Sequence, residues 1–148
     1  MTNNNEKEII RVGQISIRFL LESKDTNGQM AMFEFTVPAG AKAPAPHSHT
    51  HYDETIYGLE GVTTFTVDGQ AVDLGPGDSY FIPRGAVHGF NNLTQGTAKA
   101  LAVVTPALIG PEFFREVAAI LSAGGPPDLA KISAVMTRHG LVLAAPAR

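Results

Sequence analysis

The chain has 148 residues, a formal net charge of −3 and no cysteine. This length suits one domain with its own core, and a weak negative charge without a run of lysine or arginine argues against binding nucleic acid or an anionic membrane. Without cysteine, disulfides and thiolate ligands are excluded, so a bound metal would depend on imidazole, carboxylate, carbonyl or water.

The first ten residues are mostly polar and are predicted to form a flexible arm, because they offer almost nothing to bury. They do not show the basic patch and apolar run of a secretory signal, and no stretch approaches the roughly 20 apolar residues of a spanning helix. We therefore expect a cytoplasmic protein that does not associate with a membrane.

Extended segments are predicted from there on. Apolar residues alternate from Ile15 to Leu21, and after a turn at 25–28 a second apolar run covers 29–37. Prolines then keep residues 38–46 extended, since proline fixes its own torsion angle and biases its predecessor away from helix.

Short strands with regular turns are predicted to continue along the chain. Residues 55–74 indicate strands joined by hairpin turns, with Asp68 and Gly69 as a tight-turn pair. Glycine and proline punctuate the segments that follow in the same way. This pattern favours an all-β sandwich or small barrel over residues 11–105.

Two helices are predicted within residues 106–148. The first begins after Gly110 and ends before Gly124, and the second runs from about Pro127 to Arg138. The apolar residues at helical spacing are Phe113, Val117, Ile120 and Leu121 in the first, and Leu129, Ile132 and Met136 in the second. We expect a helical hairpin packed on the barrel or on a partner subunit. A DNA-reading helix-turn-helix is disfavoured because the second helix carries few basic residues.

Three of the five histidines stand at alternate positions, 47, 49 and 51, just before Asp53 and Glu54. Alternate residues of a strand share a face, so His47 and His49 are predicted to line one inner face. If a new strand opens at Glu54 after a connector, its carboxylate can meet them, and His51 stays outside. His88, which follows a turn marked by Pro83 and Gly85, is the remaining strong candidate for a ligand from a distant part of the chain.

Three imidazoles and one carboxylate suit Fe, Mn, Ni, Co, Cu or Zn, with one or two positions open for water or substrate. Glu54 has two roles open to it: a metal ligand throughout, or a base that takes a proton from the substrate. The candidates for a substrate pocket are His51, Tyr57 and Phe90. Phe90 shares a face with His88, although core packing is the default for aromatic residues in strands, and a place on the rim is the default for His51.

Two motifs resemble those of small single-domain bacterial cupins of the quercetinase-like kind. The first motif is matched by Gly40, His47, His49, Glu54 and Gly61, and the second by Gly77, Pro83, Gly85, His88 and Asn92. The one departure is a sixth residue between Gly40 and His47, where the family has five. The resemblance covers about residues 12–105.

The resemblance implies an all-β fold, the double-stranded β-helix or jelly-roll barrel, with one divalent transition metal held by His47, His49, Glu54 and His88. It also implies a homodimer, with the first strands or the helical hairpin as interface. The expected function is a metal-dependent, dioxygenase-type oxidoreductase acting on a small aromatic, enol or diketone substrate. A metal-dependent isomerase or lyase, and a non-catalytic module that binds or senses a small ligand, are the alternatives.

Overall fold

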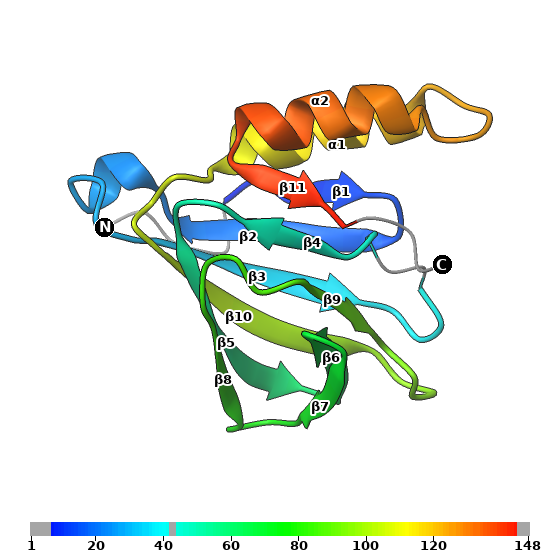
Figure 1. Ribbon diagram of the computed structural model, residues 1–148. Coiled ribbons are helices and arrows are strands. Elements are labelled where there is room, and N and C mark those ends of the chain that lie inside the picture. The colour runs from blue at the N-terminus through cyan, green and yellow to red at the C-terminus, as the bar shows by residue number, and fades with distance from the viewer. Residues whose placement is uncertain (1–6, 42–43, 145–148) are drawn as a thin grey trace.

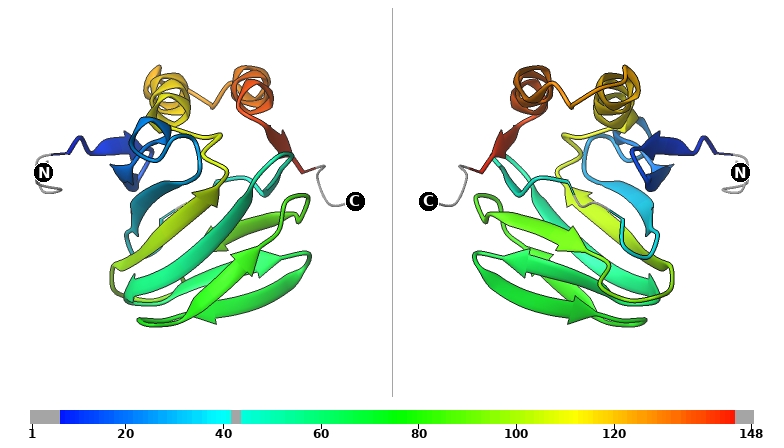
Figure 2. Two further views of the ribbon diagram at one scale, coloured as in Figure 1. Left: turned by 90° about the vertical axis from the view of Figure 1, so that its left-hand side faces the viewer. Right: turned by 90° about the vertical axis from the view of Figure 1, so that its right-hand side faces the viewer.

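Two antiparallel sheets form the body of the molecule, and a pair of helices lies along one side of them (Figures 1 and 2). The computed structural model describes residues 7–41 and 44–144. The six-stranded sheet runs in the order β1 (Ile10–Val12), β2 (Ile15–Leu21), β3 (Ala31–Val37), β10 (Ala98–Thr105), β5 (Asp53–Glu60), β8 (Ser79–Ile82). The five-stranded sheet runs β11 (Leu141–Leu143), β4 (His47–His49), β9 (His88–Asn91), β6 (Thr63–Val67), β7 (Gln70–Leu74). The predicted all-β jelly-roll with a C-terminal helical hairpin is confirmed.

The core lies between the two sheets and is lined by alternate residues of the strands. On β3 every second residue is buried, and on β10 the residues that face the core are mostly alanines, so that Ala100 lies opposite Phe35 in the register. Phe35 in turn contacts Phe65 and Phe90 of the other sheet, at ring-centroid distances of 6.2 and 5.1 Å. Small residues on one strand thus leave room for an aromatic cluster that joins the sheets.

Tight turns of the barrel use the residues that the sequence marked. Asp68 and Gly69 both have positive φ angles, 46° and 83°, which the two-residue hairpin between β6 and β7 requires. Gly61 has a φ of 59°, and a Cβ atom there would lie 2.4 Å from the carbonyl oxygen of Thr97. Its place in the first motif therefore has a steric reason.

The helical hairpin consists of α1 (Pro111–Ser122) and α2 (Leu129–Arg138), close to the predicted bounds; a short 3₁₀ turn, Ser23–Asp25, lies elsewhere. Asp128 caps α2 by accepting a hydrogen bond from the backbone N–H of Lys131 at 3.1 Å. Of the predicted apolar stripe of α2, Met136 is buried, whereas Leu129 is 63% exposed and does not pack on the barrel. Within the described residues, neither helix is long and apolar enough to cross a membrane.

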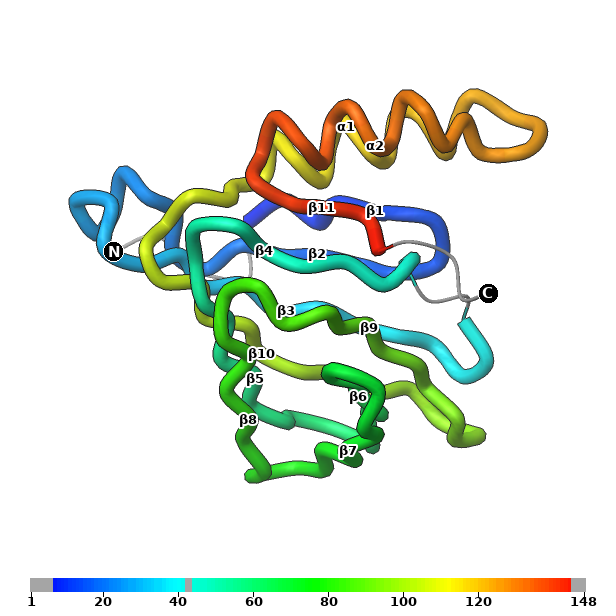
Figure 3. Tube along the Cα trace, in the orientation of Figure 1, coloured from blue at the N-terminus to red at the C-terminus, as the bar shows by residue number. Residues whose placement is uncertain are grey.

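The strand β11 was not predicted, and it adds residues 141–143 to the edge of the five-stranded sheet. Gly140, with a φ of 79°, ends the helical segment, and the next three residues pair antiparallel with β4. The tube in Figure 3 follows this path from α2 back across the barrel, where β11 runs beside β4. The strand that carries two of the candidate ligands therefore has the C-terminal strand as a neighbour.

Candidate metal centre

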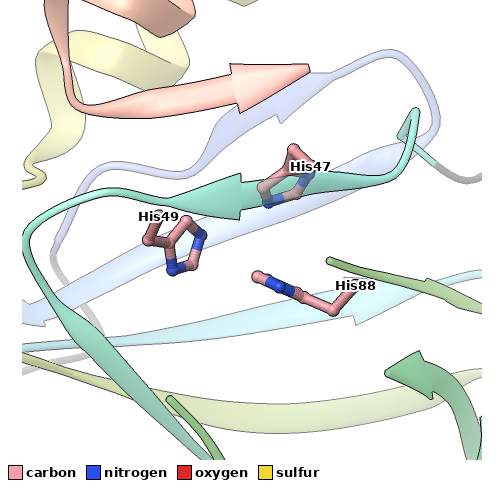
Figure 4. Close-up of side chains that lie close together, drawn as sticks. All are labelled: His47, His49 and His88. Atoms are coloured by element: carbon pink, nitrogen blue, oxygen red, sulfur yellow. The ribbon is translucent and has the colours of Figure 1, made fainter. Parts of the chain in front are cut away.

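Three histidine side chains from two strands point toward one another inside the barrel (Figure 4). His47 and His49 lie on β4, and His88 begins β9, directly opposite His47 in the register. Each ring offers a nitrogen atom, and these three nitrogens lie within 4.8 Å of one another. Such a group could hold one metal ion.

The local backbone explains why these residues meet. The strand β4 ends at His49, and β5 opens at Asp53, so a connector of three residues turns the chain between them. The turn that begins at Pro83 is tied to this point, because the N–H of Gly85 donates to the carbonyl oxygen of His49 at 2.8 Å. This hydrogen bond keeps the start of β9, where His88 lies, close to His49.

The hydrogen bonds of the rings leave the atoms that a metal would need. The Nδ1 atoms of His47 and His88 lie 3.0 Å from the carbonyl oxygens of Ala45 and Ala86. A carbonyl oxygen can only accept, so both Nδ1 atoms carry hydrogen. In the neutral ring Nε2 then keeps its lone pair, and backbone acceptors of this kind orient metal-binding imidazoles in general.

The carboxylate of Glu54 lies against two of the three imidazoles. Its Oε2 atom is 3.4 Å from Nε2 of His88 and 3.7 Å from Nε2 of His49. Burial alone would raise the pKa of Glu54, but the contact with His88 and the charges of the three histidines outweigh it and hold that pKa below its ordinary value. Glu54 is therefore an anion beside the histidines.

The three imidazoles differ in how readily they take a proton. Burial lowers the pKa of His49 to about 4 and also lowers that of His47. Burial acts in the same direction on His88, but the Glu54 carboxylate outweighs it and raises the pKa of His88. Burial thus favours the neutral, metal-binding form of His47 and His49, whereas the Glu54 carboxylate favours the protonated form of His88.

The predicted pocket residues lie in different places. His51 is exposed beyond the end of β4. Tyr57 is 45% exposed and lies on the outer face of β5, an odd number of residues from Glu54. The structure therefore brings neither residue to the histidines. Phe90 does share the inner face with His88. It is partly buried there, and its ring centroid lies 5.5 Å from that of Phe65.

Sequence reasoning missed Tyr52, an aromatic neighbour of the histidines. Its ring stacks on that of His49 at a centroid distance of 4.5 Å and an interplanar angle of 23°. The side chain is 1% exposed, its hydroxyl has no hydrogen-bond partner among the described residues, and burial raises its pKa strongly. No strand alternation could have marked it, because Tyr52 lies in the connector before β5.

Two further polar residues of the motif segments bind the backbone of other segments through hydrogen bonds. The carboxylate of Asp53 accepts hydrogen bonds from the backbone N–H of Arg84 at 2.8 Å and from its guanidinium at 3.0 and 3.2 Å. The amide of Asn92 donates to the carbonyl oxygens of Val37 and Gly96 at 2.9 and 2.7 Å. Asp53 therefore fixes the turn at Arg84 to the start of β5, and Asn92 joins the loop after β9 to the end of β3.

The donor set fits a first-row divalent ion. Three imidazoles with nitrogen atoms close together, two of them neutral, and an adjacent carboxylate provide the borderline N/O ligands that Fe, Mn, Co, Ni, Cu and Zn accept.

Comparison with known proteins agrees with this geometry. Residues 33–104 match the family described as the cupin domain. The chain is 33% identical over 112 residues to quercetin 2,3-dioxygenase of Bacillus subtilis (strain 168), a match that covers 76% of this chain and 32% of that enzyme. The chain thus spans about a third of the length of this curated relative.

Solved structures show the same fold. A polyketide cyclase from Streptomyces resistomycificus superposes with a TM-score of 0.61 at 27% identity, over 71% of this chain and 78% of that one. A protein described as a predicted oxalate decarboxylase, from Thermotoga maritima, gives a TM-score of 0.66 at 21% identity, over 72% and 98% of the two chains. The second likeness concerns the fold alone.

Proposed function

We propose that this chain, which belongs to the cupin family, is a metal-dependent oxidoreductase of the dioxygenase type that acts on a small aromatic, enol or diketone substrate. The observation that carries the proposal is the group of three histidines, two of them buried, with a carboxylate beside it. The likeness to quercetin 2,3-dioxygenase supports the choice of reaction class, since a fold by itself hosts many reactions.

In this proposal His47, His49 and His88 hold the metal through their Nε2 atoms, and Glu54 either completes the ligand set or faces the substrate. The bound ion supplies Lewis-acid polarisation of a chelating oxygen and, for a redox-active ion, electron transfer with dioxygen. The backbone carbonyls of Ala45 and Ala86 keep two of the rings in their orientation through the contacts at 3.0 Å.

We assign Glu54 the task of moving a proton. A substrate hydroxyl or enol O–H bond breaks, its proton passes to a carboxylate oxygen of Glu54, and the electron pair stays on the substrate oxygen. The low pKa of Glu54 keeps it in the basic form, and its burial beside His88 limits competition from water. Phe90, which is partly buried on the inner face that carries His88, is the aromatic side chain that we assign to contact with the substrate.

A redox-neutral reaction is the second candidate, because the same carboxylate could move a proton without dioxygen. The likeness to a polyketide cyclase at 27% identity favours it as an isomerase, lyase or cyclase. In that case the metal would polarise a carbonyl group, and Glu54 would remove and return the proton. The two candidates share the residues and differ in their need for dioxygen.

Oxygen uptake tests the proposal. Metal-free protein is loaded separately with Fe(II), Mn(II), Co(II), Ni(II), Cu(II) and Zn(II), and each form is given flavonols and β-diketones. We expect uptake with at least one redox-active ion, its loss in His88→Ala, and its retention in the matched control His51→Ala, since His51 is exposed. Product formed without dioxygen would favour the redox-neutral candidate. Binding without any product would overturn both and leave a ligand-binding module.

A further inference from the structure

The strand β4 carries two of the three candidate ligands but is short and unevenly supported. It pairs with β9 only through His47 and His88, whereas it pairs with β11 through Leu141, Val142 and Leu143, opposite residues 49, 48 and 47. Two backbone hydrogen bonds extend this second pairing at its ends. The N–H of Thr50 donates to Gly140 at 2.8 Å, and the N–H of Ala144 donates to Pro46 at 2.9 Å. We call residues 140–144 the C-terminal strap.

Two further features connect the strap with His49. Leu141 lies opposite His49 and is only 2% exposed, within the hydrophobic core. Tyr52 links the two segments a second time, because its ring stacks on His49 at 4.5 Å and its Cε1 would lie 3.5 Å from a Cβ atom built on Gly140. The strap therefore lies against His49 in two ways: Leu141 is its partner in the strand pairing, and Tyr52 packs between His49 and Gly140.

The strap is itself anchored by the helical hairpin. His139, at the end of α2, has its Nε2 atom 3.1 Å from a carboxylate oxygen of Glu116 on α1, and its ring contacts Phe113 at 5.5 Å. Arg138 pairs with the same carboxylate at 2.9 Å. The chain thus enters the strap from a fixed point, and Figure 2 shows the hairpin above this end of the barrel.

We propose that the C-terminal strap is a positioning element of the metal centre, which sets the affinity for the metal by fixing the backbone of β4. This inference rests on the metal-binding part of the proposed function. Ligand atoms must be held within a fraction of an ångström for tight binding, and β9 alone offers β4 a single residue pair. By thermodynamic reciprocity, a bound metal must stabilise the docked strap by the same factor.

A proline at Val142 tests the inference without disturbing the core, because this side chain is 53% exposed. Hydrogen-bonded pairs alternate along antiparallel strands. Since the pairs at Thr50 and at Ala144 are bonded, the alternation makes the Val142 pair a bonded one as well. Val142→Pro removes that N–H, whereas the matched control Val142→Ala keeps it.

Isothermal titration with Zn(II) and with Co(II) gives the result. We expect Val142→Pro to bind each ion at least about tenfold more weakly than wild type, as outer partners of metal ligands generally do when changed, and Val142→Ala to bind within about twofold. Circular dichroism checks that the variants keep the sheet. Equal affinity in Val142→Pro would overturn the inference, and absence of binding in wild type would instead overturn the metal site itself.

Hydrogen exchange in the wild-type chain gives a second test that needs no variant. The backbone amides of Thr50, Val142 and Ala144 should exchange more slowly, by about tenfold or more, when Zn(II) is bound. The amide of Val12, in the pair beside the two-residue turn that joins β1 to β2 in the other sheet, provides the control. Metal binding that leaves exchange in the strap unchanged would overturn the inference, even if Val142→Pro failed to fold.

Discussion

The two neighbours of β4 differ in what they contribute to the candidate metal centre. The strand β9 supplies a candidate ligand, His88, but pairs with β4 at one residue. The strand β11 supplies no ligand, yet pairs along the whole of β4. In our proposals, a ligand of the site and the support of its backbone thus come from parts of the chain about 50 residues apart, and each can be changed without directly changing the other.

Removing the contribution of β9 should have the largest effect. His88→Ala deletes a proposed ligand and leaves the carboxylate of Glu54 without its nearest imidazole, 3.4 Å away. We expect metal affinity to fall by more than about 100-fold, beyond the usual effect of an outer partner. Titration with Co(II), followed by its visible absorption, measures the loss. As the control, His51→Ala should give the wild-type titration, because His51 is exposed. A wild-type titration curve from His88→Ala would exclude His88 as a ligand.

Removing the metal should reveal how far it supports both strands. At a free Zn(II) concentration of 100 times its Kd, the loaded protein should be more stable than the chelated protein by about 2.7 kcal/mol, provided that the unfolded chain does not bind. Urea unfolding with and without a chelator measures this difference. His88→Ala serves as the control, since its unfolding should be nearly indifferent to the chelator. Equal stability of the two wild-type forms would contradict a site in the folded state.

Weakening the anchor of β11 should reduce stability. Leu141→Ala removes a side chain that is 2% exposed, and core truncations of this kind cost about 2 kcal/mol or more. Val142→Ala on the exposed face of the same strand should stay within about 0.5 kcal/mol of wild type. Urea midpoints at constant m-value compare the two. Similar losses of stability in both variants would mean that β11 does not bury one face and expose the other.

The smallest effect is expected at Tyr52, in the connector between the two motif strands. Tyr52→Phe keeps the ring on His49 but removes a buried hydroxyl that has no partner among the described residues. Because an unmade buried hydrogen bond is unfavourable, stability should rise by about 1 kcal/mol or less, with metal affinity unchanged. Thermal unfolding and Zn(II) titration measure both quantities. A destabilised Tyr52→Phe would show that the hydroxyl is hydrogen-bonded in solution.

Local signals predicted much of the barrel. The Asp68-Gly69 pair correctly predicted the hairpin between β6 and β7, because two positive φ angles in succession favour such residues. Alternation also predicted that His47 and His49 would share a face, and the structure places them so. The same alternation along β5 puts Tyr57, three residues after Glu54, on the outer face, so a pocket position for Tyr57 conflicts with the local pattern.

Other features had no local signal. Leu129 fits the helical spacing, but which turns of α2 reach the barrel depends on how the hairpin docks. The three residues of β11 are too few to show a period, and their partner strand lies more than 90 residues earlier in the sequence. Strand formation there depends on an edge of β4 that exists only after the barrel has folded.

By itself, the sequence determined which side chains this protein can offer to a metal: the spacing of two histidines and a glutamate, and a third histidine behind a proline-glycine turn, are local patterns. Only the tertiary structure decided that these groups meet within a few ångströms, that Tyr52 stacks on His49, and that β11 pairs with β4. Such contacts follow from the pairing of distant strands, and that pairing is governed by the burial of the whole core rather than by any single segment.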